Sequence, residues 1–159
     1  KGFCFDTDHE GRSGWTSAQI NENIENWLDS GETPDIVLFS SPGGNDALKG
    51  DQIEDIVHRI NAIIDKIQTH NPNVTIVIEQ MAPLHSSLIN NDLRSALTAF
   101  RTIIELIAET KSTPNSEIVV VDMATGFLDH YYADGLHYNN DGALFVAERY
   151  YSILIPLLQ

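Results

Sequence analysis

The sequence is short of cysteine and of basic residues. The first shortage excludes a kind of cross-link, and the second argues against two classes of partner. Cys4 is the only cysteine, so the chain cannot form an internal disulfide. Lysine and arginine together number 9 against 23 aspartates and glutamates, which gives a formal net charge of −14 at pH 7. An acidic surface repels nucleic-acid phosphates and anionic lipids, so we expect neither nucleic acid nor membrane as a partner. No apolar run is long enough to span a bilayer.

What the chain does contain suits a folded protein. Its 159 residues, 42% of them hydrophobic, are enough for a real core, and we expect one domain over residues 1–159. The chain starts at Lys1 rather than methionine, which leads us to expect that an upstream part was removed. Asn73-Val74-Thr75 fits a glycosylation acceptor, and on that triplet the predicted location is outside the cell.

Helix-like and strand-like patterns alternate along the chain. Helices are predicted from the capping-box pattern at 16–19 to Gly31, and over 52–69, 93–107 and 141–154. Strands are predicted over 3–5, 35–40, 74–79 and 118–121, and the continuous apolar run of 35–40 is typical of a strand covered on both faces. The alternation indicates an α/β fold, a three-layer α/β/α sandwich around a parallel, flavodoxin-like sheet. The apolar side of the last helix is predicted to comprise Leu144, Phe145, Ala147, Tyr151 and Leu154.

Three polar motifs lie where such a sheet would gather them. Asp134-Gly135-Leu136-His137 lets a carboxylate accept a hydrogen bond from an imidazole, which fixes the tautomer and leaves the other ring nitrogen as a general base. Gly43-Gly44-Asn45-Asp46 follows a predicted strand, and Gly11-Arg12-Ser13-Gly14-Trp15 precedes a predicted helix. Because the carboxyl ends of parallel strands share one edge, we expect these motifs to converge. Together they predict an acyl-transfer site.

In these motifs the chain resembles the SGNH hydrolases, also called GDSL-type esterases and lipases. Gly14, Gly43–Asp46 and Asp134–His137 match three of that family's four blocks in order, and the stretch 8–15 is similar to its carbohydrate acetyl-esterase branch. The resemblance implies that His137 is the base and Asp134 its orienter. It also implies that the Gly14 N–H and the Asn45 amide hold the oxyanion, and that no cofactor is needed. Trp15 and Tyr138 are candidate substrate-binding residues, with ordinary packing as the alternative.

The family's Gly-Asp-Ser nucleophile block is absent from this sequence, which also has Ser41-Pro42 before the Gly of the third block. We weighed Ser13, Ser40, Ser41 and Cys4 as substitutes and favour none of them. The stretch from Asp6 begins like a calcium loop but has Ser17 at its twelfth position, so no metal is predicted.

The resemblance places that block on a central first strand, so we expect the sheet to lack or replace this strand. An upstream segment, a strand-exchanged second copy or residues 1–5 could fill the place. We therefore predict a serine esterase scaffold that hydrolyses carboxylic esters through an acyl-enzyme, most plausibly acetyl esters on a carbohydrate such as xylan. By itself this chain is expected to be weakly active or inactive. The alternative is a non-catalytic glycan-binding or structural module of the same family.

Overall fold

The chain folds into two compact units. The computed structural model describes residues 9–159, the side chains of residues 91 and 92 excepted, so the strand predicted over 3–5 lies outside the described residues. The helical unit comprises Lys1–Asp35 and Gly43–Val74, and the sheet unit comprises Ile36–Pro42 and Thr75–Gln159. The expectation of one domain over the whole chain stays a prediction.

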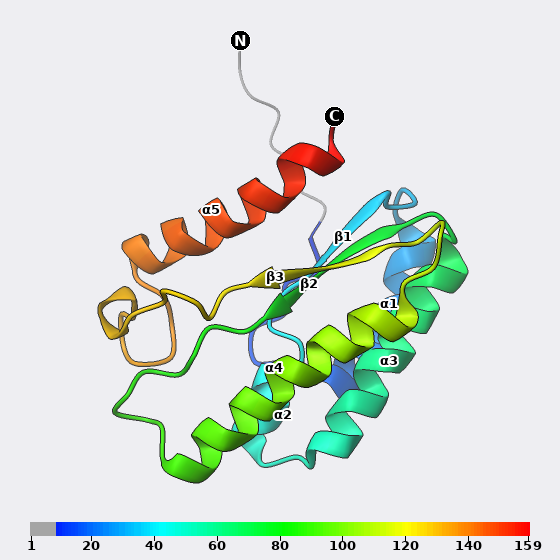
Figure 1. Ribbon diagram of the computed structural model, residues 1–159. Coiled ribbons are helices and arrows are strands. Elements are labelled where there is room, and N and C mark those ends of the chain that lie inside the picture. Colours follow the sequence, from blue (N-terminus) through cyan, green and yellow to red (C-terminus); the bar gives the residue numbers. More distant parts are fainter. Residues whose placement is uncertain (1–8) are drawn as a thin grey trace. The chain divides into compact units, whose positions relative to one another are not determined.

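The sheet unit is a parallel sheet between helices. Strands β1 (Ile36–Phe39), β2 (Thr75–Gln80) and β3 (Ile118–Asp122) are hydrogen-bonded in that order, and all pairs are parallel. Helix α4 (Asn91–Lys111) and helix α5 (Asn140–Leu157) lie on opposite faces of the sheet, and the 3-10 turn η1 (Asp129–Tyr131) precedes α5 (Figure 1).

Side-chain alternation along β2 shows which helix covers which face. Gln80 donates to the carbonyl of Arg101 and to the Glu105 carboxylate in α4, at 3.2 and 2.8 Å. Val77 points the other way, as the period-2 geometry of a strand requires, and belongs to the core cluster against which Tyr150 of α5 packs. The predicted α/β architecture, a parallel sheet with helices on both faces, is confirmed.

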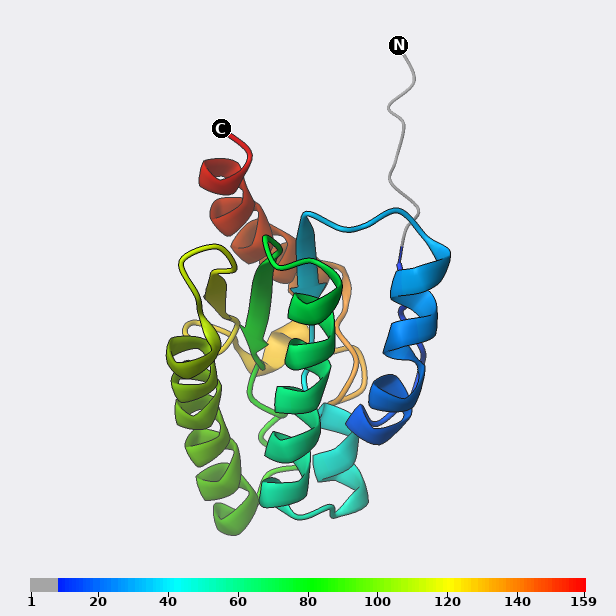
Figure 2. The same ribbon diagram turned by 90° about the vertical axis from the view of Figure 1, so that its right-hand side faces the viewer.

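The helical unit is built from α1 (Ser17–Ser30), α2 (Gly44–Lys49) and α3 (Ile53–His70), and Figure 2 shows α1 running beside α3. The predicted capping contact is present, because Thr16 N donates to Gln19 Oε1 at 3.1 Å. Lys66 of α3 donates to the carbonyl of Asn21 in α1 at 2.6 Å. Five isoleucines of α3 recur at helical spacing and are at most 2% exposed, namely Ile56, Ile60, Ile63, Ile64 and Ile67.

One helix near β1 was not predicted from the sequence, and one prediction about β1 was wrong. Residues 44–49 form the helix α2, and left-handed glycines, Gly43 and Gly50, cap it at both ends. β1 is not covered on both faces, since Leu38 is 46% exposed. Within the described residues β1 pairs only with β2, so it is an edge strand, and an apolar run alone does not distinguish an edge from a central strand.

The predicted inner face of α5 was also partly wrong. Leu144 and Tyr151 are 58% and 66% exposed, and Ala147 is exposed too. Phe145 was predicted correctly and packs on the sheet with Val146, Tyr150, Ile153 and Leu157. α5 is apolar on most sides, so its sequence does not select a face. The backbone selects it, because a Cβ on Gly142 would lie 2.3 Å from the Tyr131 carbonyl oxygen, and only glycine lets the first turn approach η1 so closely.

None of the helices in residues 9–159 is both long enough and apolar enough to cross a membrane.

Candidate functional site

Asp134 and His137 form an imidazole–carboxylate pair on the loop between β3 and α5. Asp134 Oδ2 accepts from Nδ1 of His137 at 2.7 Å, and Oδ1 accepts the backbone N–H groups of Leu136 and His137 at 3.0 and 2.8 Å. A carboxylate only accepts, so Nδ1 carries the proton and Nε2 has a lone pair. The His137 side chain is 74% exposed. This geometry suits an imidazole that takes a proton from a group in front of it.

The same hydrogen bonds keep Asp134 ionised. The backbone N–H of His137, then the ring of His137 and the backbone N–H of Leu136 lower the pKa of Asp134 to about 2. The carboxylate is therefore charged at every pH from mildly acidic to alkaline. It can orient the ring and stabilise its protonated form throughout that range.

A closed loop and an aromatic cluster hold this pair. Ala133 N donates to the His137 carbonyl at 2.8 Å, and Tyr132 and Tyr138 form an antiparallel bridge on either side of the turn. Gly135 has φ +89°, a conformation that glycine adopts without strain. The ring of Phe127 lies 5.1 to 5.3 Å from four neighbouring rings, those of Tyr131, Tyr132, Tyr138 and Phe145. Tyr138, predicted as a candidate substrate residue, is thus also a packing residue.

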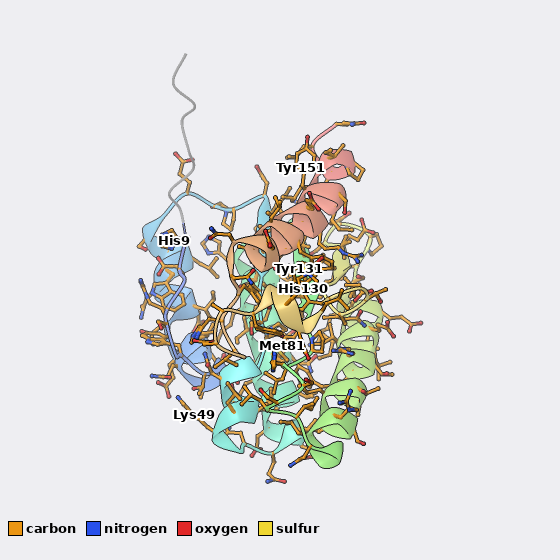
Figure 3. The ribbon with its side chains drawn as sticks, turned by 90° about the vertical axis from the view of Figure 1, so that its left-hand side faces the viewer. His9, Lys49, Met81, His130, Tyr131 and Tyr151 are labelled. Atoms are coloured by element: carbon orange, nitrogen blue, oxygen red, sulfur yellow. The ribbon has the colours of Figure 1, made fainter. Side chains whose placement is uncertain are left out.

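A second segment supports the loop, and the sequence carried no signal for it. Ser86 donates through N and Oγ to the two carboxylate oxygens of Asp129, at 3.0 and 2.5 Å. Its neighbour Leu88 lies against Gly135, where an added Cβ would be 3.3 Å from Leu88 Cδ1. Figure 3 marks His130 and Tyr131 in η1, and Met81 where the supporting segment leaves β2.

The two oxyanion candidates, Gly14 and Asn45, both lie in the helical unit. Asn45 Nδ2 donates to the Trp15 carbonyl at 2.8 Å, and the Lys49 ammonium, marked in Figure 3, donates to the Gly14 carbonyl at 3.2 Å. An amide has two N–H donors, so Asn45 can bond Trp15 and still offer one. Gly14 has φ +75°, and nothing lies within 4 Å of the position of its missing Cβ. The structure therefore joins the motif that contains Gly14 to the motif that contains Asn45.

Asp46 anchors that arrangement. It is 1% exposed and accepts from Ser17 N and Oγ at 2.8 and 2.5 Å and from Arg59 at 2.9 Å. These bonds tie the start of α1, which follows Trp15, to α2, which contains Asn45. These hydrogen bonds give Asp46 a structural role.

The substitute nucleophiles that the sequence analysis weighed and did not favour gain no support from their contacts. Ser41 Oγ lies 3.5 Å from Met81 Sδ, and Ser13 is at an exposed turn. Cys4 lies outside the described residues. Trp15, the other candidate substrate residue, stacks at a tilt on Trp27 with ring centroids 5.7 Å apart.

One buried acid was missed by the sequence analysis. Glu79, at the end of β2, is 3% exposed, and its Oε2 accepts from the backbone N–H of Ser41 at 3.3 Å and from the Tyr150 hydroxyl at 3.0 Å. Ser41 is the non-glycine residue with positive φ, +44°, within the described part of the chain. The only sequence signal was a charged residue at the end of an apolar strand. The alternation of side chains along a strand does not show whether such a residue is buried or exposed.

The described chain thus has a parallel α/β sheet with an imidazole–carboxylate pair on the loop after the last strand. Comparison with known proteins gives the family. The chain belongs to the GDSL-like lipase/acylhydrolase family, whose sequence model matches residues 4–144. This confirms the resemblance drawn from the motifs. No curated protein sequence matches the chain.

Solved structures of carbohydrate esterases are similar to this chain. A carbohydrate esterase family 3 protein from Talaromyces cellulolyticus is 29% identical, with a TM-score of 0.85 over 96% of this chain and 72% of that one. A family 3 carbohydrate esterase from Clostridium thermocellum is 30% identical, with a TM-score of 0.74 over 92% and 68%. An acetyl esterase mutant with an acetate ion is 28% identical, with a TM-score of 0.84 over 96% and 72%.

Proposed function

We propose that this protein is a serine-type esterase in which His137 is the general base and Asp134 its orienting carboxylate. The observation that carries the proposal is the 2.7 Å contact that directs Nδ1 to Asp134 and leaves Nε2 for a hydroxyl. Nε2 takes the hydroxyl proton as the oxygen attacks the ester carbonyl, and then returns it to the leaving alcohol. Water hydrolyses the acyl-enzyme by the same two proton transfers.

The negative oxygen that forms in each step needs donors, and the proposed ones are the Gly14 N–H and the Asn45 amide. Both belong to motifs shared with the family, and the Trp15 carbonyl and Lys49 hold their segments together. A hydrogen-bond donor aimed at developing charge lowers the activation free energy by roughly 3–4 kcal/mol.

The nucleophile is proposed to be a serine at the carboxyl end of a strand that pairs with the outer edge of β1. In support, β1 has no second partner strand among the described residues, and its Leu38 is 46% exposed. That strand could come from a segment of the same protein or, by strand exchange, from a second copy.

For the substrate we propose acetyl esters on a carbohydrate such as xylan. Support comes from the similar carbohydrate esterases and acetyl esterase, and from Trp15 and Tyr138, whose rings could stack on a sugar. Secretion is part of this proposal and rests on the exposed acceptor Asn73.

The test is release of acetate from acetylated xylan and from 4-nitrophenyl acetate. His137→Ala should abolish turnover, and Asn45→Ala should lower kcat about 10² to 10³-fold. His130→Ala, a nearby histidine without the carboxylate contact, is the matched control and should leave kcat unchanged. Turnover that survives His137→Ala would contradict the proposal. Xylan binding without acetate release, lost in Trp15→Ala, would instead support a non-catalytic glycan-binding module.

A further inference from the structure

Glu79 lies on the α5-facing side of β2, where a charge is unexpected. Its neighbours on that side are the apolar residues Val77 and Val121, and the residue is 3% exposed. Burial raises the pKa of Glu79, while the hydrogen bonds from Tyr150 and the Ser41 N–H lower it. A carboxyl group is costly to bury unless it is hydrogen-bonded, so these two donors account for how the fold tolerates it.

The Ser41 end of this interaction is a strained turn. With φ +44°, Ser41 adopts a left-handed conformation that serine rarely takes, and such outliers persist only where surrounding contacts hold them. Pro42, which follows, has no N–H to contribute. The bond from the Ser41 N–H to Glu79 is therefore the backbone anchor of this turn. Ser41 lies four residues before Asn45 in the chain.

Glu79 also acts on the residue that follows His137. The pKa of Tyr138 is raised, first by burial and then by the Glu79 charge, although the ring is 38% exposed. The hydrogen bonds of this one buried carboxyl reach the turn after β1 and helix α5.

We propose that Glu79 is a positioning residue: its carboxyl holds the Ser41 turn through the backbone N–H and is itself held by the Tyr150 hydroxyl. The inference rests on the proposed function, because the turn leads into the segment that carries Asn45. Glu79 touches no reacting atom. Its effect is to keep the oxyanion-donor segment in one conformation, so that the donors need no rearrangement in the transition state.

The first test does not depend on activity. In Glu79→Leu the Ser41 amide should lose its acceptor, so its hydrogen exchange should accelerate at least tenfold and the Asn45 side-chain amide resonances should shift. Glu79→Gln keeps an acceptor oxygen of the same reach and should leave both unchanged. An unchanged Ser41 amide in a folded Glu79→Leu variant would overturn the proposal. If that variant does not fold, Tyr150→Phe gives the same test, with a several-fold faster Ser41 exchange expected and no change contradicting it.

The second test separates positioning from substrate binding. Glu79→Leu should lower kcat about tenfold with KM within twofold, and Glu79→Gln should restore kcat to within threefold of the natural protein. A loss that Glu79→Gln does not rescue would show that the charge, not the acceptor, matters, and would overturn the positioning role. If the natural protein cleaves no ester, the proposed function fails, whereas the amide exchange still decides the role of Glu79.

Discussion

Asp46 in the helical unit and Glu79 in the sheet unit are both buried acids, 1% and 3% exposed, but they are stabilised differently. Asp46 pairs with the cation of Arg59 and with two donors of Ser17. Glu79 accepts hydrogen bonds from the Tyr150 hydroxyl and from the backbone N–H of Ser41. Within residues 9–159 no ion pair involves it. A carboxylate paired with a cation and several donors can tie elements together. Glu79 is held only by dipoles, and burial raises its pKa.

The largest effect is expected for Asp46→Ala. It removes the buried one of the two carboxylate partners of Arg59 and leaves the Ser17 donors without their acceptor, and breaking such a buried network costs about 3 kcal/mol. Unfolding in urea should show that loss. Asp51→Ala is the matched control: Asp51 also binds Arg59 but is 34% exposed, so its loss should stay below about 1 kcal/mol. Equal effects of the two substitutions would show that burial does not distinguish the acids.

The second prediction concerns Glu79→Gln and has a defined sign. Because the folded-state pKa of Glu79 is raised, the folded protein keeps a proton that the unfolded chain loses above its ordinary value of 4.5. The free energy of unfolding should therefore fall as pH rises from 4.5 to the raised pKa, by about 1.4 kcal/mol per unit. Glu79→Gln should lack this fall and be more stable than the natural protein above that window. Urea titrations at several pH values would measure it; parallel curves for both proteins would be the contrary result.

Tyr150→Phe should have a smaller effect. It removes one donor to Glu79, which costs about 1 kcal/mol. It should also raise the pKa of Glu79 further, because the Tyr150 hydrogen bond lowers it. Tyr151→Phe is the control on the same helix: Tyr151 is 66% exposed and points away from the sheet (Figure 3). Thermal unfolding and a carboxyl NMR titration would distinguish the two variants, and identical behaviour would weaken the contrast with Asp46.

The smallest effect on stability is expected at Asp134, an exposed acid whose pKa of about 2 comes from local hydrogen bonds. Its favourable charge state is present above the ordinary pKa and is lost only as pH falls through about 2. His137→Ala should raise the pKa only part of the way back, because the backbone N–H groups of residues 136 and 137 remain. A carboxyl NMR titration measures this, with His130→Ala as a control. A full return to the ordinary value would show that the imidazole alone causes the shift.

Local patterns predicted much of the fold because they depend on neighbours in the chain. The five buried isoleucines of α3, the capping contact of Gln19 and the strand before Gln80 follow from periodicity and turn chemistry. The predictions for β1 and α5 failed where burial depends on distant partners. Leu38 lies on an edge strand within the described residues, and the face of α5 follows from the contact of Gly142 with Tyr131.

For the candidate site the division is similar. The spacing of Asp134 and His137 predicted their contact, because a turn of three residues brings the two side chains together. The spacing of Gly14 and Asn45 did not predict that Asn45 donates a hydrogen bond to the Trp15 carbonyl. No sequence pattern indicated the buried Glu79 or the hydrogen bonds from Ser86 to Asp129. Those contacts join residues that are 30 to 71 positions apart in the chain.

By itself, the sequence determined the family motifs, the alternation of strands and helices and the imidazole–carboxylate pair, because each arises within one turn or one element. Only the tertiary structure decided which acids are buried, which face of α5 is inside and what holds the strained turn at Ser41. Burial and hydrogen-bond partners depend on segments that the chain brings together only when it folds, and the free energy of a charged group depends on those surroundings.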